Sequence, residues 1–283
     1  MPGVTSVDLV DRRELLDRLE QYYDAVPRSG ARVEDLGPLT LFIREGQGWP
    51  FSARPTLGWS GAVSAADVNR VRARQRELGI PESFEWVAAT APALRAAVEQ
   101  AGLTVHEHPL MVLDPDVPTP AVPEVADGVV VRTVGPDDPV LPSALAVPDL
   151  AFAEPGTGGG AAGLAELGEA VRGHASDGSV ERAVARILAG LTCVAAAVED
   201  STALCAGQHQ PVGAVSEIVG VGTLPTARRR GLAHAVTAVL VADARSRGVE
   251  TIFLSAGDDD VARIYARLGF RSVATALIAE PVE

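Results

Sequence analysis

The spacing of hydrophobic and polar residues in the first half of the chain predicts alternating helices and strands. Leu15, Leu19 and Tyr22 recur at the spacing of one helix face. Ser64 is a good helix N-cap, and Gly79 follows the same predicted helix at its end. The predicted helices are 6–25, 64–78 and 91–101, and the predicted strands are 39–43, 51–56, 84–88 and 104–113.

The second half opens with a predicted strand at 129–134 and a helix at 140–151. The segment 153–180 is rich in glycine and alanine, which predicts a flexible loop that carries a short helix. Two apolar runs joined by Glu-Asp-Ser predict a hairpin. The hairpin strands are 192–198 and 202–208, the other strands are 214–224, 251–255 and 271–279, and the helices are 181–189, 231–247 and 258–268.

A proline-rich stretch separates the two halves. Because proline has no backbone N–H and stiffens the chain, we expect a linker at 114–128 between a first domain of residues 1–113 and a second of residues 129–283. Both halves end in helix, glycine, short strand, helix and strand, and the segments 101–113 and 268–280 align without gaps. This agreement predicts a tandem duplication in which one copy has degenerated.

The composition narrows the classes of function. The 283 residues are 47% hydrophobic and carry a net charge of −13, so the chain has enough material for a core but no overall basic footprint for nucleic acid. All 24 cationic residues are arginines, which excludes a lysine nucleophile or Schiff base. Without a signal peptide or a long apolar stretch, we expect a cytoplasmic protein that does not bind membranes.

The two cysteines, Cys193 and Cys205, stand in apolar runs, where small buried hydrophobic residues are expected. None of the five histidines lies at ligand spacing from them, so we expect no metal site. His209, in the sequence Gln-His-Gln-Pro, is expected in a surface turn.

The segment 217–233 contains the sequence pattern that is most informative about function. A strand ends at Pro225, three arginines follow, and a helix begins at Gly231. The first N–H groups of a helix have no intrahelical partner and favour anions, so this turn predicts a phosphate-binding site. The alternative is an ordinary surface turn before an amphipathic helix. Gly220 and Gly222 interrupt the preceding strand, which suggests a bulge or a close approach of a ligand, and Asp258 can cap a later helix.

These motifs resemble the GNAT superfamily of acyl-CoA-dependent N-acetyltransferases. The first signature is matched by Arg228, Gly231 and Ala233, and the second by Asp258, Tyr265 and the sequence Leu-Gly-Phe at 268–270. The resemblance covers residues 129–283 and is specific in the last 70 residues. It departs from the family where Thr223 replaces a valine and Ala233 replaces the second glycine.

The resemblance implies an α/β fold of two GNAT-like domains, each a mostly antiparallel mixed sheet flanked by helices, and acetyl-CoA as the co-substrate. The residues of the second domain that it assigns to coenzyme A are Val221, Gly222, Thr223, Arg228, Arg229, Arg230, Gly231, Leu232, Ala233, His234 and Asp258. The first domain has no arginine in the corresponding stretch and Val98 in place of the tyrosine, so we expect it to bind no acyl-CoA.

The resemblance also implies direct attack of an amine on the thioester, with no covalent enzyme intermediate. Tyr265 is the candidate acid for the leaving thiolate, and Glu217 is the candidate base. The alternatives are a tyrosine packed in the core and a solvated or ion-paired glutamate. Glu154 and His174 lie in the segment where the family builds its acceptor pocket and are candidate substrate contacts.

Three functions stay open at this point. The first is transfer of an acetyl group to a small-molecule primary amine. The second is binding or sensing of acyl-CoA without transfer, and the third is other acyl chemistry, with another acyl donor or hydrolysis of the thioester. The sequence identifies neither the acceptor nor the oligomeric state, so a homodimer is open.

Overall fold

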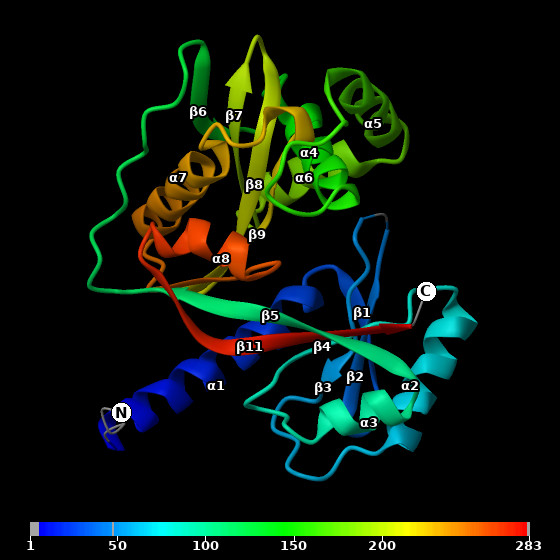
Figure 1. Cartoon of the computed structure of the whole chain (residues 1–283). Coiled ribbons are helices and arrows are strands. Elements are labelled where there is room, and N and C mark those ends of the chain that lie inside the picture. Colours follow the sequence, from blue (N-terminus) through cyan, green and yellow to red (C-terminus); the bar gives the residue numbers. More distant parts are fainter. Residues whose placement is uncertain (1–5, 47, 282–283) are drawn as a thin grey trace. The chain divides into compact units, whose positions relative to one another are not determined.

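The structure, a computed structural model, describes residues 6–46 and 48–281. The chain divides into two compact units (Figure 1). Unit 1 contains the chain up to Leu110 and the final segment from Ser272, and unit 2 is Met111–Arg271. Each unit has its own cluster of buried hydrophobic residues. No described helix combines the length and the apolar character that crossing a bilayer requires.

Unit 1 contains a three-stranded sheet and, in a separate sheet, the strand pair β4–β11. The sheet β1-β2-β3 is antiparallel, and β4 pairs antiparallel with β11, the last strand of the chain. Trp86, Phe84 and Phe42 are its largest fully buried side chains. The elements are α1 (Ser6–Arg28), β1 (Ala31–Asp35), β2 (Leu39–Arg44), β3 (Arg54–Pro55), α2 (Ala65–Leu78), β4 (Phe84–Val87), α3 (Leu94–Gln100), β5 (Leu103–Leu113) and β11 (Phe270–Pro281).

Unit 2 is built on the strand order β10-β9-β8-β7-β6, antiparallel except for the parallel pair β9–β10. The mixed, mostly antiparallel α/β architecture is the predicted fold class. The elements are β6 (Val129–Val134), α4 (Leu141–Ala153), α5 (Leu164–Ser176), α6 (Ser179–Leu188), β7 (Cys193–Glu199), β8 (Thr202–Val212), β9 (Val215–Thr223), the 3₁₀ turn η1 (Pro225–Ala227), α7 (Leu232–Ser246), β10 (Thr251–Ser255) and α8 (Asp259–Ala266).

Helices cover both faces of this sheet. A Cβ built on Gly207 would meet Leu240 of α7 at 3.4 Å. The neighbouring Ala206 lies opposite Gly222, where a built Cβ would meet Ala151 of α4 at 2.8 Å. Because successive residues of a strand point to opposite faces, α7 covers one face and α4 the other. Figure 1 shows α4, α5 and α6 grouped on the side of the strands away from α7.

The order of elements repeats along the chain. The series α1-β1-β2-β3-α2-β4-α3-β5 has the same order of helices and strands as α6-β7-β8-β9-α7-β10-α8-β11. This is the order that the proposed duplication predicts. Strands β5 and β11 each contribute to both cores. Leu103 of β5 and Leu277 of β11 are buried in the core of unit 1, whereas Met111 of β5 and Phe270 of β11 are buried in the core of unit 2.

Two segments differ from the sequence-based expectations. The strand β1 was not predicted, because its sequence Ala-Arg-Val-Glu-Asp has no fully buried position. The segment 153–180, expected to be a flexible loop with a short helix, contains the whole of α5. Glu166 accepts a hydrogen bond from the N–H of Gly163 at 2.8 Å and Leu167 is buried, so the helix has both an N-terminal anchor and a core contact.

Candidate active site

The parallel strands β9 and β10 are paired over only part of their length. The register matches Thr251 with Val215 and ends where Phe253 lies opposite Glu217. Beyond this point β9 continues to Thr223, while β10 ends at Ser255. The edge of β9 that follows Glu217 therefore has no partner from β10, and main-chain groups there are available to an extended ligand.

Two glycines shape this part of β9 in different ways. Gly220 has φ +64° and lies in an irregularity of the β8–β9 register, which steps from the pair Gln208–Val219 to the pair Ala206–Gly222. This confirms the predicted bulge. A Cβ on Gly222 would lie 2.8 Å from Ala151 and 2.9 Å from the Cα of Pro148. At Gly222, the close approach expected from the sequence is therefore made by helix α4.

The turn before α7 contains several main-chain N–H groups that have no hydrogen-bond partner among the described residues. Arg229 and Gly231 both have left-handed backbone conformations, with φ of 66° and 76°. No side chain caps α7. Within the described part of the chain, the N–H groups from Arg229 to His234 make no hydrogen bond. The space that a Cβ on Gly231 would fill is open. Unpaired N–H groups at a helix start are suited to a phosphate group.

The three arginines of this turn have three different environments. Arg228 donates to the main-chain carbonyl oxygens of Ala151 at 2.9 Å and Gly158 at 3.1 Å, and also to that of Glu154. Arg230 forms an ion pair with Glu199 at 2.6 Å. Arg229 is exposed. The Arg229 side chain is thus the one placed in solvent beside the free N–H groups, whereas Arg228 is occupied within the protein.

The loop between α4 and α5 is tied to this turn by further hydrogen bonds. The carboxylate of Glu154 accepts from the N–H groups of Ala161 and Ala162 at 2.9 and 2.8 Å, which lowers the pKa of Glu154. The N–H of Gly160 donates to the carbonyl of Pro225. Glu154, a candidate substrate contact, therefore holds its own loop in place.

His174, the other candidate substrate contact, pairs with Asp149 of α4. The distance from His174 Nε2 to Asp149 Oδ2 is 2.7 Å, and this hydrogen bond raises the pKa of His174. Its other ring nitrogen, Nδ1, is buried without a hydrogen-bond partner among the described residues. The pair joins α5 to α4, the helix that packs on Gly222.

Tyr265 lies on α8 and is 7% exposed. Its ring makes an edge contact with Phe270, with centroids 6.2 Å apart. Burial, and secondarily the proximity of Cys205, raises the pKa of Tyr265, so the phenol stays protonated at neutral pH. Cys205 accepts a hydrogen bond from the hydroxyl of Thr223 at 3.2 Å and lies opposite it in the sheet. Tyr265 and Cys205 both belong to the buried hydrophobic cluster of unit 2.

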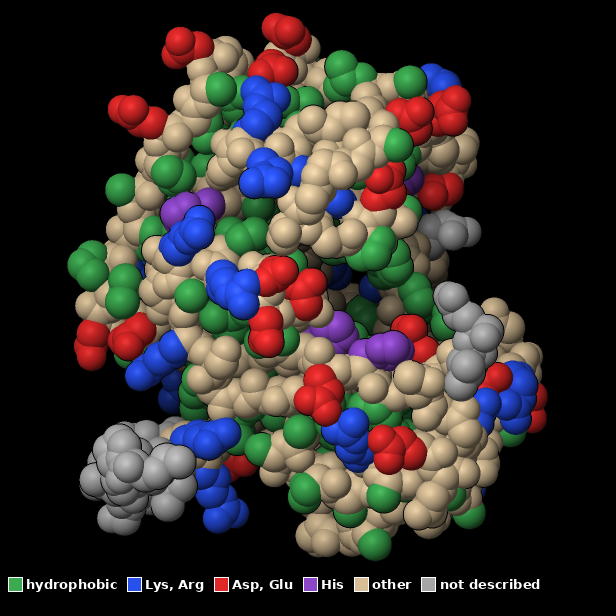
Figure 2. Space-filling model, viewed as in Figure 1, with side chains coloured by type: hydrophobic (Ala, Val, Ile, Leu, Met, Phe, Trp, Pro, Cys, Tyr) green, Lys and Arg blue, Asp and Glu red, His purple; other side chains and the backbone are tan. Residues whose placement is uncertain are grey.

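The other predicted site residues occupy distinct places. Glu217 is partly buried at the last paired position before β9 and β10 separate. Asp258 caps α8, as predicted, by accepting the N–H of Val261 at 2.7 Å. Leu232 is buried and Ala233 partly buried in the first turn of α7. Burial, followed by the charge of Arg267, lowers the pKa of His234. Arginine and acidic side chains are interspersed over the face of the molecule in Figure 2.

The expectation for His209 was wrong. His209 lies in β8 and is 0% exposed, with hydrogen bonds to Ser216 of β9 and Asp243 of α7. The predicted hairpin continues further than expected, so that His209 lies directly opposite Cys193. Extending the pairing of the hairpin strands would have revealed this contact, whereas the spacing along the sequence does not. Both cysteines are buried, as predicted.

Part of the chain matches a known protein family in sequence, and most of the chain is similar to solved structures. Residues 195–278 match the family described as FR47-like protein. No curated protein matches the sequence. A GCN5-related N-acetyltransferase from Kribbella flavida is similar in structure, with a TM-score of 0.64 and 22% identity over 95% of this chain and 96% of that chain.

Two further solved structures share the fold. A GCN5-related N-acetyltransferase from Sphaerobacter thermophilus has a TM-score of 0.55 and 19% identity, over 87% of this chain and 81% of that chain. A tandem GNAT protein from the clavulanic acid biosynthesis pathway has a TM-score of 0.54 and 16% identity, over 87% and 79% of the two chains. The chain therefore shares the fold of these GNAT structures, and residues 195–278 match the FR47-like family, in agreement with the resemblance of its motifs to the GNAT superfamily.

Proposed function

We propose that the protein is an acyl-CoA-dependent N-acyltransferase that moves an acetyl group from acetyl-CoA to a small-molecule primary amine. The observation that carries this proposal is the row of unpaired N–H groups from Arg229 to His234, next to the unpaired edge of β9. Main-chain donors at the start of a helix fit a pyrophosphate, and a free strand edge fits the amide-containing pantetheine arm.

The charges of the turn support the same assignment. Arg229 is exposed beside the free donors, and Arg230 is only partly buried in its ion pair with Glu199. In a chain with a net charge of −13, a local cationic site is needed to attract a multiply charged anion. Arg228 supports binding indirectly, because it fixes the loop beside the turn.

The proposed reaction requires two proton transfers. As the amine nitrogen attacks the thioester carbonyl, a proton leaves the ammonium group, and the carbon–sulfur bond breaks to release a thiolate. Glu217, at the point where β9 and β10 separate, is the proposed base, acting directly or through water. Tyr265 is the proposed acid, and its raised pKa keeps the proton on the phenol until the thiolate forms.

The acceptor side is proposed to be formed by the loop from Glu154 to Gly163 and by α5. The hydrogen bonds of Glu154, Gly160 and Arg228 hold this loop beside the turn that precedes α7. The acidic chain favours a cationic amine over an anionic one.

The binding half of the proposal is tested by calorimetric titration of coenzyme A at two salt concentrations. Arg229→Glu reverses a charge beside the free donors and should weaken binding about tenfold, with a smaller loss at high salt. Arg172→Glu makes the same change of net charge at an exposed position of α5 and is the matched control. Equal affinities of the two variants would contradict the proposed phosphate site.

The transfer half is tested by release of free thiol from acetyl-CoA in the presence of a panel of primary amines. Tyr265→Phe removes only the hydroxyl and should lower kcat about 100-fold without changing the affinity for coenzyme A. Glu217→Gln should lower kcat and shift the pH profile. If coenzyme A binds but no amine accelerates thiol release, the protein binds acyl-CoA without transferring it. Thiol release without any amine would instead indicate hydrolysis.

A further inference from the structure

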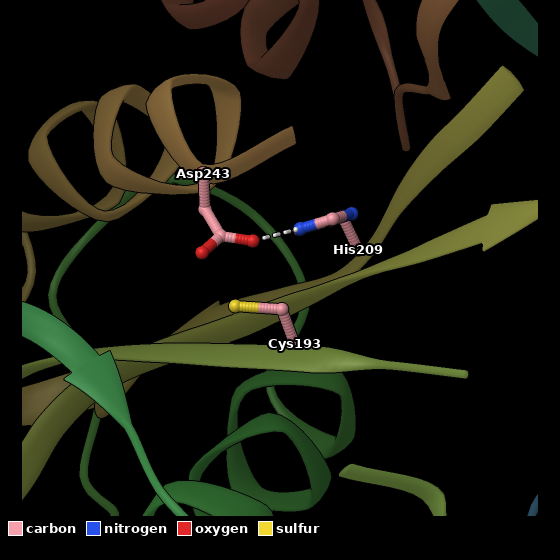
Figure 3. Close-up of side chains that lie close together, drawn as sticks. All are labelled: Cys193, His209 and Asp243. Carbon is pink, nitrogen blue, oxygen red and sulfur yellow. Dashed lines mark hydrogen bonds and ion pairs between the residues drawn. The ribbon is translucent and has the colours of Figure 1, made fainter. Parts of the chain in front are cut away.

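The core of unit 2 contains a compact group of three side chains that the proposed transfer reaction does not use. Cys193 on β7 lies directly opposite His209 on β8, and Asp243 reaches them from α7, which covers the sheet (Figure 3). Their potential ligand atoms, one from each residue, all lie within 4.8 Å of one another. The two strands of one hairpin and the helix α7 thus direct a thiol, an imidazole and a carboxylate to one point.

The group is sheltered and held in position from outside. His209 is 0% exposed, and its Nδ1 lies 2.8 Å from the Oγ of Ser216, which is outside the group. Arg247, the C-cap residue directly after α7, pairs with the carboxylate of Asp243. The positions of the imidazole and of the carboxylate are therefore fixed by neighbours that would remain in place around an ion.

We propose that Cys193, His209 and Asp243 form a binding site for a single zinc ion. Thiolate, imidazole and carboxylate are the three protein ligands that Zn²⁺ takes, and the thiolate disfavours the hard ions Mg²⁺ and Ca²⁺. With zinc–ligand bonds of about 2.0–2.3 Å, the ligand atoms of a tetrahedral site are separated by roughly 3.2–3.8 Å. The imidazole and carboxylate atoms, 2.9 Å apart, would have to separate slightly, and the group as a whole, whose ligand atoms lie within 4.8 Å of one another, would have to contract around the ion.

The proton balance of binding follows from the hydrogen bonds. Zn²⁺ binds cysteine as a thiolate and histidine as a neutral imidazole. Zinc requires the lone pair of Nε2, and the imidazole proton then resides on Nδ1, where Ser216 Oγ accepts it. The thiol gives up its proton to solvent. Each zinc ion that binds releases one proton, and binding strengthens as the pH rises.

The place of Asp243 along α7, far from the start of the helix, gives the proposed ion a structural role. Asp243 lies eleven residues after Leu232, and at 1.5 Å per residue this is about 16 Å from the helix start that forms the proposed phosphate site. The ion would join the hairpin β7–β8 to α7 and hold the helix on the sheet. Water completes the coordination from the side of Asp243, whose side chain is 18% exposed.

The experiment uses the whole protein, stripped with a chelator and titrated with Zn²⁺ against a competing chromogenic chelator. We expect about one equivalent to bind, with release of one proton in weakly buffered solution and a higher melting temperature. Titration with Co²⁺ should give the charge-transfer absorption of a cobalt–thiolate bond and the visible bands of a four-coordinate ion. A wild-type protein that shows neither uptake of zinc nor the thiolate absorption overturns the proposal without recourse to any variant.

Variants then identify the ligands. Cys193→Ser should remove the thiolate absorption and weaken zinc binding at least 100-fold, and Ser216→Ala, which leaves the ligands intact, should weaken it about 10- to 100-fold. Two control variants alter a cysteine and a histidine elsewhere in unit 2. Cys205→Ser alters the other buried cysteine, and His174→Gln alters the histidine paired with Asp149. Equal loss of zinc in the controls, or none in Cys193→Ser, contradicts the site.

Discussion

Arg228 donates a hydrogen bond from Nη2 to the main-chain carbonyl oxygen of Ala151, 77 residues earlier in the chain, at 2.9 Å. Its guanidinium also reaches the carbonyl oxygens of Glu154 and Gly158. The arginine of the GNAT signature therefore joins the turn before α7 to the end of α4 and the loop that follows. Arg228 thus connects the proposed phosphate site with the proposed acceptor side.

Replacing Arg228 with alanine should release this loop. Hydrogen bonds from a charged donor are worth about 1.5–3 kcal/mol, so we expect unfolding to become easier by about 2 kcal/mol. Amide hydrogen exchange should accelerate between residues 155 and 163, while the strands of unit 2 keep their protection. Arg229→Ala, at the exposed neighbour, should leave both measurements unchanged. Equal exchange in the two variants would show that Arg228 does not hold the loop.

The N-terminal cap of α8 can be tested by comparing substitutions of two adjacent aspartates. Asp258 accepts the N–H of Val261, whereas the adjacent Asp259 is exposed in the first helical turn. Asp258→Ala should lower the free energy of unfolding by about 1 kcal/mol, measured by chemical denaturation. Asp259→Ala removes the same charge near the same helix end but no hydrogen bond, so it should cost a few tenths of a kcal/mol. Similar losses would show that the charge, not the cap, stabilises the helix.

The order of elements was largely predictable because periodicity is a local property of the chain. The helix from Leu232 and the cap at Asp258 were both anticipated from short contiguous patterns. Strand β1 was missed because three of its five residues are charged and Val33 is its one large apolar residue. The segment that contains helix α5 was expected to be a flexible loop with only a short helix, because a glycine-rich composition resembles that of a loop, although Glu166 and Leu167 anchor the helix.

The candidate site was predictable where it is contiguous and not where it depends on contacts between distant segments. The turn with free N–H groups follows from one stretch of sequence. The partners of Arg228 lie about 70 residues or more away, and nothing in the motif indicates that carbonyl oxygens occupy its guanidinium. The burial of His209 depends on the register of β7 and β8 and on Asp243 of α7, which are properties of the folded sheet.

Gly222 should tolerate no side chain because α4 occupies the space. The Cβ of an alanine would lie 2.8 Å from the Cβ of Ala151 and 2.9 Å from the Cα of Pro148, so either β9 or α4 must shift. We expect Gly222→Ala to cost about 1–3 kcal/mol of stability.

The matched control for this substitution is Gly220→Ala. It meets no atom within 4 Å but has φ +64°, so it should cost about 1 kcal/mol through backbone strain alone. Thermal denaturation of both variants gives the comparison. A Gly222→Ala protein as stable as the wild type would show that α4 does not pack this closely on β9.

The pair formed by His174 and Asp149 should make the packing of α5 on α4 dependent on pH. The hydrogen bond to Asp149 raises the pKa of His174 above its ordinary value of about 6.5, although burial opposes this shift and Arg182 lowers the pKa slightly. The folded state therefore binds the proton more tightly than the unfolded state. The pair's stabilisation is complete below about pH 6.5 and is lost as the pH rises through the folded-state pKa.

Melting temperatures of the wild type and His174→Gln, measured from pH 5 to pH 8.5, test this sign. The wild type should exceed the variant most at low pH, and the difference should shrink toward pH 8.5. His209 has the opposite shift, because burial lowers its pKa, but it is present in both proteins and cancels in the difference. Asp149→Asn should reproduce the loss seen in His174→Gln. A difference that grows with pH would show that His174 is held neutral, and that Asp149 does not stabilise its charged form.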